Sequence, residues 1–167
     1  AWYLPEERQI TTKEQMLDEM CATLGGRAAE DLFLNRISTG AMNDLERVTK
    51  QAYGMIAYLG MSDKLPNLCY YNNEEYSFNR PYSEKTAELI DTEVKNMVNE
   101  QYERAKKILS EHREGHNQLA QLLIDKEVIF AEDVERIFGK RPWASRSEEI
   151  MAAKESQEAA EAEKRLA

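Results

Sequence analysis

Little in this 167-residue sequence could build a disulfide framework, a membrane span or a nucleic-acid surface. Its two cysteines, Cys21 and Cys69, lie far apart in unlike contexts, which favours a reducing compartment over a disulfide or a thiolate metal site. No run approaches the ~18 consecutive apolar residues that a membrane-spanning helix needs. The 22 basic residues are outnumbered by 31 acidic ones, and the net charge of −9 argues against a surface that binds nucleic-acid phosphates.

Two further absences concern the start of the chain and the binding of nucleotides. The N-terminus has no initiator methionine and neither the basic nor the apolar region of a signal peptide, so we expect a piece of a longer protein. The chain also lacks the phosphate-binding loop G-x-x-x-x-G-K-[ST], so we do not expect it to bind ATP in that manner.

The sequence is rich instead in helical patterning. Apolar residues make up 42% of the chain, enough for one folded domain of the mainly α class. The opening AWYLPEERQI differs, because Trp2 and Leu4 alternate with Tyr3 and Pro5 blocks a helix, which predicts a short N-terminal strand and then a loop. Apolar residues then recur at helical spacing. The predicted helices cover residues 12–34, a segment from near Thr39 to Gly60, residues 83–112, a segment after Gly115 that carries Leu119, Leu122 and Leu123, and residues 131–138.

A glycine pair interrupts the first of these predicted helices. Gly25 and Gly26 would each cost about 1 kcal/mol in a helix interior. The apolar pattern continues in phase across the pair, so one helix is expected over residues 12–34. We therefore expect a close-contact site at the pair, where a neighbouring backbone leaves no room for a Cβ atom.

Two segments fall outside the helical pattern. Residues 61–82 form a connection long enough to predict a functional flap, a hairpin or a flexible region. Residues 144–167 are rich in Ala and Glu without a repeating apolar face, which predicts a solvated helix or a disordered tail. The folded domain is accordingly expected to span residues 1–143.

The two histidines lie four residues apart in the segment HREGH. On one helix face, His112 and His116 would have the spacing of a zinc site. The metalloprotease motif H-E-x-x-H, however, carries its general base directly after the first histidine, whereas the acid here is Glu114. Two solvated histidines at a helix end are therefore expected, with adventitious metal binding as the alternative.

One acidic residue stands out at a predicted helix start. The segment STGAMNDLERVT, residues 38–49, begins with capping residues and places Asp44 in the first turn or so of an apolar-faced helix. An acid at this position usually stabilises the helix through the helix dipole. A ligand role for Asp44 is the alternative that the residues leave open.

Five stretches resemble one family and follow its order over residues 1–143. They resemble the peptidase domain of the FtsH family, which consists of membrane-anchored AAA+ ATP-dependent zinc metalloproteases. The fold implied is a helical bundle with a short strand near its start. The stretches are AWYLPEER, TKEQMLDEMCATLGGRAAEDLF, ISTGAMNDLERVTKQAYGMIAYLGMSDKL, PYSEKTAELIDTEV and LLIDKEVIFAEDVERIFGKRP.

The resemblance implies a metal site that this chain supplies only in part. In such enzymes zinc is held by the two histidines of H-E-x-x-H and by a later Asp, whose position resembles Asp44. Glu30 resembles a family acid that would orient a zinc-bound histidine, and the pair Gly25–Gly26 would pack against the zinc-bearing helix. Because H-E-x-x-H is absent, residues 1–143 resemble the C-terminal portion of the peptidase domain, expected to be inactive alone.

The implied function is that of an ATP-dependent zinc metalloendopeptidase acting on unfolded or membrane proteins. Such enzymes assemble as hexamers, and upstream segments bind ATP and anchor the protein in the membrane. The expected location is the cytoplasmic side of a bacterial inner membrane, or the matrix side of an organellar one, with the piece itself soluble. The alternative is a non-catalytic helical module for oligomerisation or docking.

Overall fold

The computed structural model describes residues 10–70, 81–140 and 151, and these residues are mainly helical. This confirms the mainly α class. The short strand predicted near the N-terminus falls in residues 1–9, outside the described residues, as does all of the predicted tail 144–167 except Met151. The boundary at residue 143 stays a prediction. The helices are α1 (Lys13–Leu34), the short 3-10 helix η1 (Thr39–Ala41), α2 (Met42–Ala57), α3 (Glu84–Glu111), α4 (Arg113–Lys126) and α5 (Ala131–Phe138).

The chain divides into two compact units. Residues 10–113 form one unit, which holds α1, η1, α2 and α3. The described part of the other unit holds most of α4 together with α5. None of the helices in the described part of the chain combines the length and the apolar content of a membrane span.

Local hydrogen bonds set where the long helices begin. The Thr12 side chain accepts from the Gln15 amide at 3.3 Å, and the Thr12 amide donates to Gln15 Oε1 at 3.0 Å, which is a capping box. Ser83 caps α3 by accepting from the Thr86 amide at 3.3 Å. These bonds satisfy amides that have no partner within the helix, so both helix starts could be predicted from the sequence.

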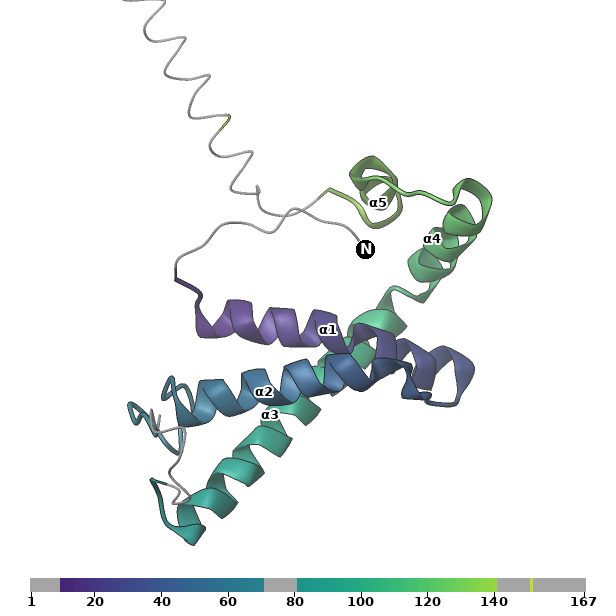
Figure 1. Ribbon diagram of the computed structural model, residues 1–167. Coiled ribbons are helices and arrows are strands. Elements are labelled where there is room, and N and C mark those ends of the chain that lie inside the picture. The colour runs from purple at the N-terminus through teal and green to yellow at the C-terminus, as the bar shows by residue number, and fades with distance from the viewer. Residues whose placement is uncertain (1–9, 71–80, 141–150, 152–167) are drawn as a thin grey trace, which may run out of the picture. The chain divides into compact units, whose positions relative to one another are not determined.

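The core of the first unit lies where its three long helices meet. α1 and α2 run side by side in opposite directions, and α3 packs across both (Figure 1). The buried side chains follow the predicted apolar stripes, and Gln101 is a buried polar residue that the pattern does not predict. The largest fully buried side chains are Met20, Leu24, Val48, Met55, Ile56 and Ile90.

The predicted close contact at the glycine pair is wrong for the described residues. A Cβ atom built on Gly25 or Gly26 would meet no other atom within 4 Å. The buried positions of α1 are Met20, Cys21, Leu24 and Ala28, so the pair lies beside the face that packs against α2 and α3. The single continuous helix predicted over residues 12–34 is confirmed.

Two other glycines are explained by close neighbours. Gly60 has a φ of +60° and follows α2, and a Cβ atom there would come within 2.9 Å of the amide nitrogens of Asn67 and Leu68. The two separate helices expected before and after Gly115 are confirmed as α3 and α4, but the break lies at His112, and Gly115 lies inside α4. A Cβ atom at Gly115 would collide with the ring of Phe138, so packing between α4 and α5 accounts for this glycine.

The loop after α2 is fastened to α3 by Glu93. Ser62 Oγ donates to Glu93 Oε2 at 2.8 Å, and Lys64 Nζ donates to Glu93 Oε1 at 2.8 Å. Ser62 is itself buried. Lys64, followed by the Ser62 hydrogen bond, holds the pKa of the Glu93 carboxyl below its ordinary value of 4.5. The ionised carboxylate therefore stabilises the folded loop.

We expect Glu93→Gln to unfold at a lower urea concentration than the wild type at pH 7. Because the folded-state pKa of Glu93 lies below 4.5, its stabilisation is complete above that pH and is lost as the pH falls through the folded-state value. The difference in free energy of unfolding should therefore shrink below pH 4.5. Urea titrations of both proteins across this range test it, with exposed Glu88→Gln on α3 as control. A difference that stays constant with pH would contradict the assignment.

Candidate functional site

Asp44 lies in the first turn of α2 with its carboxylate exposed. No hydrogen bond or ion pair joins it to any other residue in the described part of the chain. The positive end of the helix dipole favours a negative charge here. The Asp44 carboxylate is therefore able to act as an oxygen ligand, and its oxygens form no hydrogen bond or ion pair with the other described residues.

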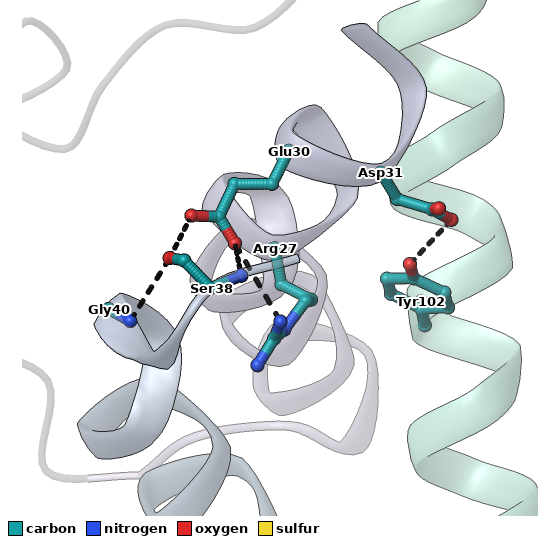
Figure 2. Close-up of polar contacts among 6 residues, drawn as sticks. All are labelled: Arg27, Glu30, Asp31, Ser38, Gly40 and Tyr102. Atoms are coloured by element: carbon teal, nitrogen blue, oxygen red, sulfur yellow. Dashed lines mark hydrogen bonds and ion pairs between the residues drawn. The ribbon is translucent and has the colours of Figure 1, made fainter. Parts of the chain in front are cut away.

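The start of α2 is tied to the end of α1 through Glu30. Glu30 Oε1 accepts from Ser38 Oγ at 2.5 Å, and Glu30 Oε2 accepts from the Ser38 amide at 3.2 Å (Figure 2). Arg27 Nη1 lies 3.7 Å from Glu30 Oε2. The two hydrogen bonds from Ser38, and then the nearby positive charge of Arg27, lower the pKa of the Glu30 carboxyl. Glu30 is thus an ionised acceptor that holds the loop leading to Asp44.

The adjacent acid, Asp31, points to a different helix. Asp31 Oδ2 accepts from the Tyr102 hydroxyl at 2.8 Å and lies 3.2 Å from Lys106 Nζ. These hydrogen bonds from α3 lower the pKa of Asp31. Burial, followed by the bond to Asp31, raises the pKa of Tyr102. Neighbouring acids on α1 therefore face opposite ways, Glu30 toward η1 and Asp31 toward α3 (Figure 2).

The two histidines of HREGH do not lie in one continuous helix. His112 follows the last residue of α3 with φ −108° and ψ 26°, and His116 lies within α4. The four-residue spacing of a zinc site therefore does not fall within one continuous helix, because the backbone breaks between the two helices at His112. His112 is exposed and His116 is half-buried, so the expectation of two solvated histidines holds fully only for His112.

A complete metal site is not formed by the residues that the structure describes. Among them, no three His, Cys, Asp or Glu side chains lie together in a way that could hold a metal ion. Tight binding of zinc depends on several ligands held at once. Asp44 fits the role of one oxygen ligand, and the remaining ligands would have to come from elsewhere.

Sequence reasoning named Asp44 and Glu30 but missed Ser38 and Arg27, which are the neighbours of Glu30. The signal for Ser38 was present, since a serine before a helix start is a typical cap. Its bond to Glu30 spans eight residues across the end of α1, where Asn35 adopts a left-handed conformation with φ 49°. No local pattern predicts that this turn brings the two side chains together.

Comparison with known proteins places the chain in a family. Residues 1–137 match the sequence model of peptidase family M41. The chain is 69% identical over 157 residues to the ATP-dependent zinc metalloprotease FtsH of Parabacteroides distasonis, covering 93% of this chain and 23% of that protein. It is 46% identical over 145 residues to ATP-dependent zinc metalloprotease FTSH 10, mitochondrial, of Arabidopsis thaliana, covering 87% and 18%. It is 40% identical over 149 residues to the mitochondrial inner membrane m-AAA protease component AFG3L2 of Mus musculus, covering 88% and 19%.

The chain spans less than a quarter of the length of these relatives. The matched region includes Glu30, Ser38 and Asp44, and it runs into the last turn of α5. These matches confirm the resemblance carried by the sequence motifs. Because residues 1–137 cover most of the sequence, the chain belongs to peptidase family M41.

Proposed function

We propose that this chain forms part of the peptidase domain of an ATP-dependent zinc metalloendopeptidase, in which Asp44 supplies one of three protein ligands to zinc. The observation that carries this proposal is the exposed carboxylate of Asp44, unpaired among the described residues, inside the segment that matches family M41. The relatives named above as zinc metalloproteases support it. The peptidase portion would span residues 1–143, with residues 144–167 as a tail.

In this proposal the chain helps to hold the zinc ion and to orient one of its histidine ligands. A zinc ion held by Asp44 and two histidines would supply Lewis acidity to the scissile carbonyl and would lower the pKa of a bound water to about 7. Asp44, in the first turn of α2, would offer a carboxylate oxygen without giving up any contact within the fold. The histidine ligands and the general base would come from an H-E-x-x-H helix outside this sequence. Glu30 would orient one of those histidines.

The open flank of α1 offers room for such a helix. Nothing lies within 4 Å of the Cβ positions of Gly25 and Gly26 among the described residues, and a second backbone could approach there closely. Leu34, Ile37 and Met42, near the turn between α1 and α2, are each at least 60% exposed. Where exposed apolar side chains form a contiguous patch, they often mark a contact with a partner or a further segment.

The whole protein would act as a membrane-anchored, ATP-dependent enzyme. We propose that it assembles as a hexamer, that an upstream domain binds ATP, and that unfolded or membrane polypeptides are the substrates. The membrane would be reached only through upstream segments, with the peptidase part on the cytoplasmic side of a bacterial inner membrane or the matrix side of an organellar one. The relatives, which include a mitochondrial inner membrane m-AAA protease component, support this setting.

A non-catalytic role in oligomerisation or docking is the second candidate. Ile124, Val128 and Phe130, in and after α4, are exposed by 74%, 55% and 65% respectively. Such apolar exposure suits an assembly contact. The coding sequence upstream of Ala1 decides between the candidates, because an encoded H-E-x-x-H supports the peptidase and its absence supports the assembly module.

The isolated 167-residue chain should show no zinc-dependent hydrolysis of casein. A single carboxylate ligand cannot hold zinc tightly, and among the described residues no three potential ligands lie together in a way that could hold a metal ion. The measurement compares release of labelled casein fragments with added zinc and with a chelator, using the longer protein as positive control. Robust cleavage by the isolated chain that a chelator stops would contradict the proposed division of the site.

A further inference from the structure

We propose that Ser38 is a positioning residue for Asp44, because it links Glu30 on α1 to the turn from which α2 starts. The inference rests on the proposed role of Asp44 as a zinc ligand. It adds that α1 sets the place of the Asp44 carboxylate through one serine.

The first half of the link joins α1 to Ser38. Both carboxylate oxygens of Glu30 are used: one accepts from the Ser38 hydroxyl at 2.5 Å and the other from the Ser38 amide at 3.2 Å. Two bonds to one residue restrain its side chain and its backbone together. Arg27, whose side chain is 15% exposed, lies 3.7 Å from Glu30 and favours the ionised carboxylate.

The second half of the link joins Ser38 to α2. Ser38 Oγ accepts from the Gly40 amide at 3.2 Å and so caps η1 (Figure 2). α2 follows η1 directly, and its own N-cap residue, Ala41, makes no side-chain cap. The Met42 amide instead donates to the Thr39 carbonyl of η1. The first turn of α2, which carries Asp44, is therefore fixed by η1 and its serine cap.

The chemistry of Ser38 suits both bonds at once. An ionised carboxylate can only accept hydrogen bonds, so the Ser38 hydroxyl must be the hydrogen-bond donor to Glu30. A lone pair on the same oxygen is then left to accept the hydrogen bond from the Gly40 amide. Alanine can do neither, whereas threonine keeps the hydroxyl. The site is also tight, since a Cβ atom on Gly40 would lie 3.3 Å from Ser38 Oγ.

Hydrogen exchange in this chain tests the link without any metal. In Ser38→Ala, the amides of Gly40 and of the first turn of α2 should exchange about fivefold or more faster, the usual size of a lost cap, while Val48–Ala57 should change little. Ser38→Thr should restore the wild-type rates. Tyr102→Phe is the matched control, because it removes the hydrogen bond from the Tyr102 hydroxyl to Asp31 and leaves Ser38 untouched. Unchanged exchange at Gly40 in Ser38→Ala would overturn the proposal.

Zinc affinity, measured by chelator competition in the longer protein that carries the histidine ligands, tests positioning itself. Ser38→Ala should weaken zinc binding about 10- to 100-fold, as loss of a ligand's support does, while Ser38→Thr and Tyr102→Phe stay near wild type. Unchanged affinity in Ser38→Ala, in a protein where Asp44→Asn loses zinc, would reduce Ser38 to a local cap and overturn the inference. Unchanged affinity in Asp44→Asn would overturn the proposed function instead, so the two failures are distinguishable.

Discussion

If the proposed function is right, Asp44→Asn should abolish casein hydrolysis by the longer protein that carries the histidine ligands, with a loss of at least about 100-fold, and leave the fold intact. Changes even to residues behind a metal ligand cost about 10- to 100-fold, and an amide oxygen is a weaker zinc ligand than a carboxylate. The fold should survive because Asp44 is exposed and pairs with no described residue. Only the favourable charge at the helix start is lost, which is worth about 0.3–1 kcal/mol.

The measurement combines the rate of casein cleavage, bound zinc per subunit and the midpoint of thermal unfolding. Glu46→Gln is the matched control, because Glu46 is an acid on the same helix whose partner among the described residues is the exposed Lys50, at 2.5 Å. It should keep wild-type activity and zinc content. Wild-type turnover in Asp44→Asn would contradict the zinc-ligand role of Asp44 and would favour the hypothesis that this chain is an assembly module.

Leu24→Ala should cost about 3–5 kcal/mol in free energy of unfolding, a large part of the stability of a domain this size. Leu24 is 1% exposed and packs in the cluster of α1 and α2 side chains that includes Met20 and Met55. Truncation removes buried apolar surface and leaves a cavity, since the surrounding helices relax only in part. The loss should appear as a lower urea midpoint.

Leu34→Ala provides the matched control for this prediction. It is the same substitution in the same helix, but Leu34 is 60% exposed. The free energy of unfolding should change by only about 0.5 kcal/mol, as at other exposed positions. Equal losses in the two variants would mean that the core does not lie where the structure places it.

The helices could be predicted because their causes are local. Thr12 and Ser83 cap the helices that follow them, and the apolar stripe that contains Met20 and Leu24 repeats at helical spacing. The predictions that failed concern positions whose role depends on a residue distant in sequence. Gly115 was taken as a break, yet the ring of Phe138 explains it.

The candidate site likewise has features that could be predicted from local sequence and features that depend on distant residues. The position of Asp44 at a helix start follows from residues 38–49 alone, and its ligand role was suggested by family motifs. That Glu30 and Asp31 serve different helices could not be predicted, because both are acids in one run. Tyr102, the partner of Asp31, lies 71 residues away along the chain.

Composition, periodicity and motifs were enough to establish that this chain is acidic, mainly helical and a member of a peptidase family, because these features depend on residues close together in sequence. The partners of the individual acids among the described residues became known from the folded structure alone. Glu30 is held by Ser38 and Asp31 by Tyr102, whereas Asp44 has no partner among the described residues. The physical reason is that a hydrogen bond depends on distances of about 3 Å, and folding alone brings separated side chains that close.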